Sequence, residues 1–195
     1  MKPKTEKINS RALYTRQLLK ESLLELMKKK PIAKISLSEL CREADVNRNT
    51  FYTHYDSPEM LLACIEHDFY KQVQHSVTEA LRTKDTLGLF EKICQTIYKN
   101  RELCSILFSE HGNKDYLRTI LELSRDLADE KWEGDGVRAM HCGIDLLYHF
   151  FLNGALSIMQ LWIENGMQEP PENIAHFLYH AVYYGRQGFL SDQSR

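Results

Sequence analysis

The sequence has few helix-breaking residues and none of the short patterns that mark common active sites. Nine Gly and five Pro occur in 195 residues, and no segment alternates apolar and polar residues over the length of a strand. A β-sheet fold is therefore disfavoured, and an all-α fold is expected. There is no G-x-S-x-G, phosphate-loop or H-E-x-x-H pattern. We therefore expect a protein that is not an enzyme and that has no cofactor or metal.

Long apolar runs and paired cysteines are also missing. The most apolar stretch, Leu146 to Ile163, is interrupted by His149, Asn153 and Gln160, and no uninterrupted run reaches the roughly 18 residues of a membrane span. Met1 to Ser10 is polar, unlike a signal peptide. The five cysteines form no C-x-x-C pair, which is typical of reduced, buried thiols in a cytoplasmic protein. They are Cys41, Cys64, Cys94, Cys104 and Cys142.

Charge is divided unevenly along the chain. Residues 1–56 carry twelve Lys or Arg against seven Asp or Glu, whereas residues 57–195 carry thirteen against twenty. The overall charge of −2 thus conceals a basic segment and an acidic one. Such a division predicts a module that binds a polyanion, followed by a body with a different task. We expect two domains, 1–56 and 57–195.

Two short helices joined by a tight turn are predicted within the basic segment. Ser36 to Glu39 form a capping box that begins a helix ending near Ala44. Asp45 to Asn47 leave room only for a tight turn. Asn47 is then able to cap the next helix, which continues through Tyr55. This spacing is that of a helix-turn-helix, with a solvated pair of surface helices as the alternative.

Longer helices surround this pair. Apolar spacing predicts one from about Ser10 to Lys29, ended by Pro31. Another begins at Ser57 and Pro58 and carries an i+4 stripe from Leu61 to Leu81, enough for about 25 residues that connect the two domains (57–82). The remaining helices bring the total to about nine. They are expected at 86–99, 102–110, 113–132, 136–165 and 171–190.

The helix-turn-helix assigns roles to individual side chains. Leu37, Leu40, Ala44, Val46, Phe51 and Tyr55 face inward and fix the angle between the helices. The outer surface then carries side chains able to read base edges, which are Asn47, Arg48, Asn49, Thr50 and Thr53. Ser36, Tyr52 and His54 suit phosphate oxygens, which fix register without reading sequence.

These residues resemble the DNA-binding domain of TetR/AcrR-type transcriptional regulators. The similar segments are Thr15 to Met27, Ile35 to Tyr55 and Ser57 to Leu62, and the stretch N-R-N-T-F-Y-T-H-Y looks like their recognition helix. The stretch from His149 to Ala175 is similar to the last helices of a subgroup that includes regulator-like proteins of dihydroxyacetone kinase operons. Two positions depart from the pattern. Asp45 stands in place of the usual Gly in the turn, and Pro58 in place of a frequent Lys.

The resemblance implies a homodimer that binds a double-stranded DNA operator, most simply as a repressor. Two recognition helices would enter major grooves of a pseudo-palindrome about one turn, or ~34 Å, apart. The last two helices of each subunit would form a four-helix interface. The residues expected there are Phe151, Ala155, Ile158, Met159, Trp162, Val182 and Tyr183.

The resemblance also implies a small-molecule effector of unknown identity in the second domain. Residues suited to line its pocket are Phe90, Phe108, His111, Tyr116 and Tyr148, although each suits an ordinary core as well. The competing hypothesis is a helical ligand carrier or metal-binding protein without sequence-specific DNA binding. Its metal version rests on helical spacings of His141, Asp145 and His149, and of His176 and His180. The basic first domain favours the regulator, since a carrier does not need it.

Overall fold

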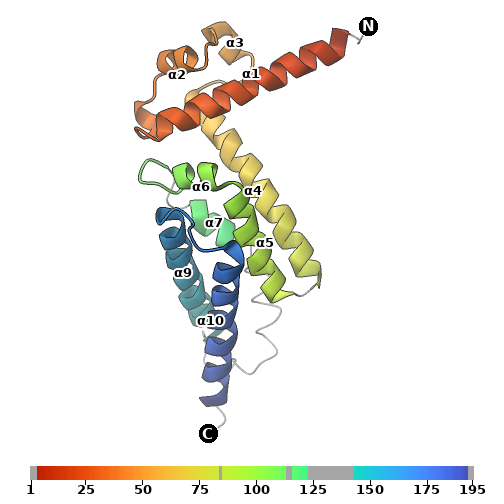
Figure 1. The fold of residues 1–195 in the computed structure, drawn as a ribbon, viewed down its shortest axis with the longest axis vertical. Coiled ribbons are helices and arrows are strands. Elements are labelled where there is room, and N and C mark those ends of the chain that lie inside the picture. Colours follow the sequence, from red (N-terminus) through yellow and green to blue (C-terminus); the bar gives the residue numbers. More distant parts are fainter. Residues whose placement is uncertain (1–3, 84, 113–115, 123–142, 193–195) are drawn as a thin grey trace. The chain divides into compact units, whose positions relative to one another are not determined.

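The computed structural model describes residues 4–83, 85–112, 116–122 and 143–192 (Figure 1). These ranges hold nine α-helices, one short 3-10 helix and no strand. The predicted all-α fold is confirmed. The chain divides into two compact units, one of Met1–Phe69 with Ser109–Asn113 and the other of Tyr70–Phe108 with Lys114–Arg195. This division falls inside a helix, whereas the sequence placed it before that helix begins.

The first unit is built around one long helix. The helix α1 spans Lys4–Met27 and begins before the expected Ser10, because no Gly or Pro interrupts Lys4 to Ser10. The short elements η1 (Ile32–Lys34), α2 (Leu37–Glu43) and α3 (Arg48–Tyr52) follow, and α4 (Pro58–Thr83) then begins. Their core contains Leu19, Leu23, Met27, Leu40, Phe51 and Leu61, all fully buried.

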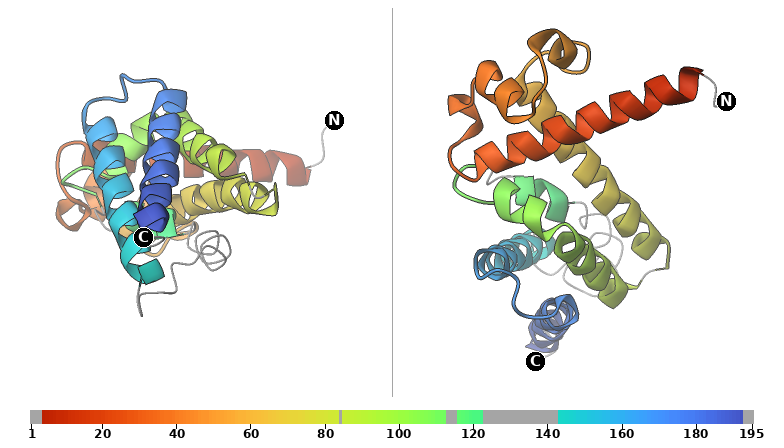
Figure 2. Two further views of the ribbon diagram at one scale, coloured as in Figure 1. Left: turned by 90° about the horizontal axis from the view of Figure 1, so that it is seen from below. Right: turned by 45° about the horizontal axis from the view of Figure 1, so that its top comes forward.

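Five helices and the end of α4 make up the described second unit. They are α5 (Thr86–Lys99), α6 (Arg101–Leu107), α7 (Tyr116–Glu122), α9 (Gly143–Glu164) and α10 (Pro171–Asp192). In this unit α10 packs along α5 and also contacts α9, while α6 and α7 pack against α9 (Figures 1 and 2). The helices predicted at 113–132 and 136–165 extend into residues 123–142, which lie outside the described part.

The connection between α9 and α10 is held by one buried side chain. The Trp162 Nε1–H donates to the Glu169 carbonyl over 2.9 Å, and the Trp162 ring stacks on Tyr98 of α5. The chain turns at Gly166, whose φ of +72° is a conformation that glycine adopts without strain. On α10, Gly185 faces Phe151 of α9, and a Cβ there would lie 3.0 Å from that ring. These contacts fix how α9 and α10 pair within the subunit.

The helix α9 is also apolar enough to resemble a membrane span. Asp145–Glu164 passes such a test by length and composition, and 44% of its best window is buried inside the protein. The sequence, by contrast, favoured no span in this stretch because polar residues interrupt it. Less than half of that window is buried, so α9 also carries an exposed face that is largely apolar.

The described cysteines are free thiols, and three of them are buried. Burial raises the pKa of Cys94 to about 12, and nearby Glu172 adds to the rise. Burial alone raises the pKa of Cys104 still further. Cys64 is partly exposed, and Cys142 lies outside the described residues. The thiolate is the reactive form, so the buried thiols are protected both sterically and chemically.

We therefore predict that iodoacetamide at pH 8 alkylates Cys64 in the native protein at least about 100-fold faster than Cys94 or Cys104. Peptide mass spectrometry over a time course measures each rate. In guanidinium chloride the rates should converge, which controls for peptide recovery. Equal native rates at Cys64 and Cys94 would contradict the packing of α5.

Candidate nucleic-acid interface

The turn between α2 and α3 closes with a defined hydrogen-bond pattern. Val46 N–H donates to the Cys41 carbonyl over 2.9 Å, and Asp45 N–H donates to the Arg42 carbonyl over 3.3 Å. This is a Schellman motif, in which the residue after the C-cap takes a left-handed conformation. Asp45 is that residue, with φ of +50°. The turn predicted at Asp45 is thus confirmed, with Asp in a conformation that glycine adopts more easily.

Side-chain caps begin both helices of the pair. The Ser36 hydroxyl accepts from Glu39 N–H over 3.3 Å, as the capping box predicts. The Asn47 side-chain oxygen accepts from Thr50 N–H over 2.8 Å. These caps satisfy amides that have no partner within the helix, so two short helices hold their ends without a long run of internal bonds.

The burial of individual side chains in α2 and α3 agrees with the inward and outward faces predicted for these helices. Leu40, Ala44, Phe51 and Tyr55 are buried, while Leu37 and Val46 are half-buried. The eight predicted DNA-binding residues all lie on α3 or beside its ends and on the α2 cap. Thr50 and His54 are half-buried, and the exposed members are Ser36, Asn47, Arg48, Asn49, Tyr52 and Thr53.

Several of these side chains already have partners within the first unit. The Arg48 guanidinium donates to the Ser38 hydroxyl on α2. The Thr53 hydroxyl donates to the Thr50 carbonyl over 2.7 Å, and this bond takes its proton inward. Its methyl group thus becomes the part of Thr53 best suited to meet a base.

An ion pair joins the end of α1 to α2. Lys30 Nζ lies 2.6 and 2.8 Å from the two carboxylate oxygens of Glu39. The bond to Lys30 lowers the pKa of Glu39, and the Ser36 backbone amide adds to this effect. Lys30 is therefore partly neutralised by Glu39, so the basic run Lys28 to Lys30 presents less free charge than its composition indicates.

The start of α4 carries its own negative charge. Ser57 caps the helix by accepting from Met60 N–H over 3.2 Å. The pKa of Glu59 is lowered by a bond from its own backbone amide and by the Ser57 hydroxyl. A carboxylate held in its charged form already compensates the positive end of α4. A DNA phosphate would have to compete with it.

The family comparison gives the fold a context. The model of the TetR "transcriptional regulator C-terminal region" matches residues 84–183, about half of the chain. The chain belongs to the TetR family of transcriptional regulators. The family resemblance inferred from the sequence is thereby confirmed.

Two relatives are similar over most of the chain. The uncharacterized HTH-type transcriptional regulator YxbF of Bacillus subtilis (strain 168) is 23% identical over 177 residues, which is 88% of this chain and 45% of the relative. The chain thus spans about half the length of that protein. The solved structure of the dihydroxyacetone kinase operon activator DhaS is 14% identical, with a TM-score of 0.59 over 88% of this chain and 95% of DhaS. That likeness concerns the fold.

For this TetR family member, the exposed face of α9 and α10 differs from the expected interface. Met159 and Trp162, with 0% and 4% exposure, are buried in the subunit's own core and are not available to a partner. Phe151, Ala155, Ile158 and Val182 are half-buried, and Tyr183 is exposed. Six large exposed apolar side chains lie on these two helices, and five of them stand at positions other than the expected ones. They are Leu146, Phe150, Leu161, Phe177, Tyr183 and Tyr184.

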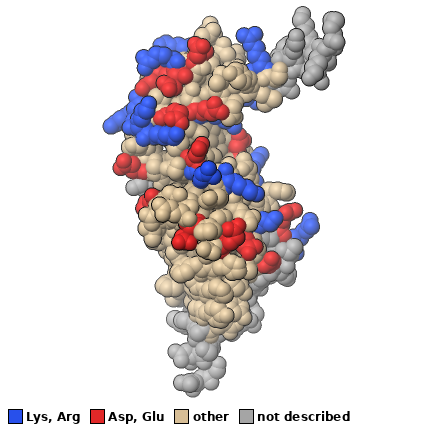
Figure 3. Space-filling model, viewed as in Figure 1, with Lys and Arg blue, Asp and Glu red and all other residues tan. Residues whose placement is uncertain are grey.

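This face, called here the α9–α10 apolar face, consists of those six residues. Figure 3 shows a broad area over α9 and α10 without described Lys, Arg, Asp or Glu side chains, whereas charges of both signs cover α1 to α3. The interface predicted from the sequence includes Phe151 and Trp162, whereas the structure exposes the residues before them, Phe150 and Leu161. Because α9 carries large apolar residues on more than one side, hydropathy alone does not reveal which side faces inward.

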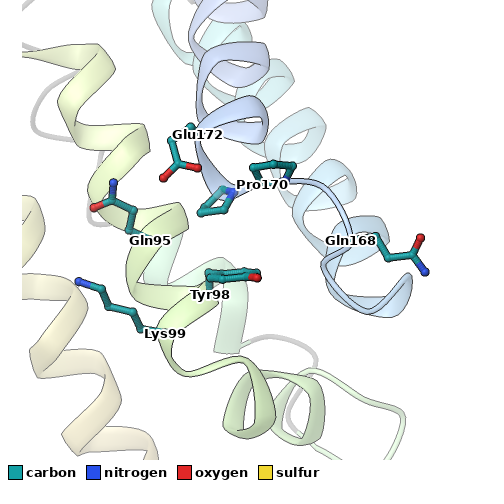
Figure 4. A pocket seen from close by; sticks show the side chains of 7 residues that line it. Gln95, Tyr98, Lys99, Gln168, Pro170 and Glu172 are labelled. Carbon is teal, nitrogen blue, oxygen red and sulfur yellow. The ribbon is translucent and has the colours of Figure 1, made fainter.

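The predicted effector residues are mainly core. Phe108 and Tyr116 are buried and stack on each other with ring centroids 6.0 Å apart, and Tyr148 is buried as well. Phe90 and His111 are half-buried. The structure instead describes an open depression of about 540 Å³ beside α5, which none of these five residues lines (Figure 4). Its lining residues are Gln95, Tyr98, Lys99, Gln168, Pro170, Pro171 and Glu172.

The histidine spacings lead to aromatic stacking rather than a metal cluster. His176 and His180 have ring centroids 6.2 Å apart, and His180 stacks on Tyr184. Among the described residues no three His, Cys, Asp or Glu side chains converge as metal ligands would. His141 lies outside the described part, so its spacing to Asp145 and His149 stays a sequence pattern.

The turn at Asp45 yields a stability prediction. Asp45→Val should lower the free energy of unfolding by about 1–2 kcal/mol, because a β-branched residue at positive φ is strained. Asp45→Gly should not lower it. Denaturant titration followed by circular dichroism measures both variants, with exposed Asp56→Val as the control for loss of an aspartate. Equal stability of the Val and Gly variants would show that Asp45 is not held left-handed.

Proposed function

We propose that this protein is a homodimeric regulator that binds a pseudo-palindromic operator with one α3 helix in each half-site. The observation that carries the proposal is the exposed face of α3, with Arg48 and Asn49 beside a capped N-terminus. Arg reads guanine O6 and N7 through two parallel hydrogen bonds, and Asn reads adenine in the same way. The inward face is fully used by Leu40 and Phe51. The outer face is therefore free to contact DNA.

Phosphate contacts would place this face on the duplex. Ser36, Tyr52 and His54 border α3, and residues 1–56 carry a balance of +5. Lys and Arg side chains that neutralise phosphates release counterions and supply affinity that does not depend on sequence, whereas hydroxyl donors such as Ser36 and Tyr52 fix the register. The acidic remainder of the chain would be repelled by DNA. That charge division favours docking through the first unit.

The α9–α10 apolar face supports the homodimer. Its exposed members include Phe150, which is 72% exposed, and a group of large exposed apolar side chains on two helices is typical of an interface. A two-fold axis would pair each face with its own copy. Family members use these last two helices in the same way. The dimer would bring two recognition helices to one operator.

Regulation by a dimer of this kind follows from where it binds. A dimer that covers a promoter excludes polymerase, so we propose repression in the cytoplasm. The structural relative DhaS is by its name an operon activator, so the direction of control needs its own assay. Release by a small-molecule effector is the family pattern. In this chain the open depression around Tyr98 is a better starting point than the core aromatics.

Selection from a random duplex pool tests the proposal. The purified protein should enrich an inverted repeat whose half-sites are about one helical turn apart. A reporter driven by a promoter that contains the enriched sequence then gives the sign of regulation. Enrichment of no sequence would favour the ligand-carrier alternative.

Arg48 provides a residue-level prediction. Arg48→Ala should weaken binding to the enriched duplex by about 1–3 kcal/mol and should relax the preference at one base pair of each half-site. Affinity for unrelated DNA should change much less. Fluorescence anisotropy at fixed salt measures both affinities, and exposed Arg101→Ala on α6 controls for loss of a positive charge. An unchanged operator affinity would remove Arg48 from the recognition face.

Phe150 tests the interface separately. Phe150→Asp should convert the dimer to a folded monomer, because a dimer would have to bury the new carboxylate without a partner. Sedimentation velocity at micromolar concentration reports the mass, and circular dichroism reports the fold. Leu13→Asp, at an exposed leucine of α1, should stay dimeric. A dimeric Phe150→Asp protein would place the interface elsewhere.

A further inference from the structure

One side chain outside the predicted DNA-binding set contacts its most informative member. Ser38 lies on the first turn of α2, and its hydroxyl accepts a hydrogen bond from the Arg48 guanidinium at the start of α3. Both side chains are exposed. The bond therefore joins the two helices on the outer surface, at the N-terminal end of α3.

A second observation places the guanidinium against α2. Burial raises the pKa of the Cys41 thiol, and the positive charge of Arg48 opposes that rise. Cys41 is one helical turn beyond Ser38 on α2. The hydrogen bond to Ser38 thus holds the Arg48 guanidinium beside α2, while Arg48 stays exposed.

We propose that Ser38 is a positioning residue that holds Arg48 for base reading and so helps to set the sequence preference of the protein. This inference rests on the proposed function. An arginine carries five N–H donors, so one bond to Ser38 leaves enough donors for a two-bond contact with guanine. An untethered arginine would lose more rotamer freedom on binding, and the serine reduces that loss before DNA arrives.

The geometry also limits the size of the effect. The bond is solvent-exposed and competes with water, so its contribution is that of one ordinary hydrogen bond. Ser38 occupies an early helical position where Ala is a good helix former, so Ser38→Ala should fold. Loss of the hydroxyl should then appear in DNA recognition and not in stability.

The test compares variants on one palindromic duplex from the selection and on its single-base-pair substitutions. Ser38→Ala should weaken binding to the palindrome by about 3- to 10-fold and should flatten the preference at the base pair that Arg48→Ala also affects. Ser38→Thr keeps a hydroxyl and should restore both properties. Ser105→Ala, at an exposed serine of α6, should bind as the wild type does.

The double variant separates positioning from an independent contact. If Ser38 acts through Arg48, Ser38→Ala should add nothing to the loss already caused by Arg48→Ala. A fully additive loss, or a Ser38→Ala protein with unchanged preference at that base pair, would overturn the inference while leaving the proposed function intact. An Arg48→Ala protein with unchanged operator affinity would overturn the recognition face itself, and the role of Ser38 with it.

Discussion

The helix-turn-helix surface depends on a single backbone constraint, the positive φ of Asp45. This residue ends α2 in a Schellman motif and lets α3 start three residues later. The turn brings Leu40 and Phe51 into one core while it turns Arg48 and Asn49 outward. A different turn would rotate α3 and send the same side chains inward. The proposed recognition surface is therefore a consequence of the turn together with the two apolar residues that it brings together.

In the second unit, α9 carries large apolar side chains on both its buried and its exposed side. In α9, apolar residues such as Met159 and Trp162 fill the subunit's core, and others such as Phe150 and Leu161 remain exposed. A helix that is apolar on both sides needs a second partner or a membrane. Under the proposed function, a second copy of the chain covers the exposed side.

Local chemistry made much of the first unit predictable from the sequence. Helix starts are marked in the sequence by residues whose side chains can cap a helix, and the structure confirms the caps at Ser36, Asn47 and Ser57. The i+4 stripe of α4 predicted the length of that helix, because the described apolar residues that repeat along the sequence are also the buried ones. The beginning of α1 was missed because Lys4 to Ser10 is mostly polar and carries no apolar stripe. Arg48's bond to Ser38 was missed because it depends on two rotamers.

The less predictable parts depend on tertiary packing. The inward side of α9 is set by α6, α7 and α10, so the sequence pattern was off by one residue at Phe150 and Leu161. The aromatic pair Phe108 and Tyr116 suited a pocket or a core equally from the sequence, and in the structure both are buried and stack on each other. When two residues come into contact only because their helices pack together, the sequence near either residue does not indicate that contact.

Hydrogen exchange of the full chain with and without its selected duplex tests the central claim most directly. If α3 is the DNA-reading element, amides from Ser36 to Tyr55 should exchange more slowly with the selected duplex than with a scrambled one. Amides of α5 and α10 should show no such difference in specific protection. Sequence-specific protection confined to the second unit, with Ser36 to Tyr55 unchanged, would contradict the account.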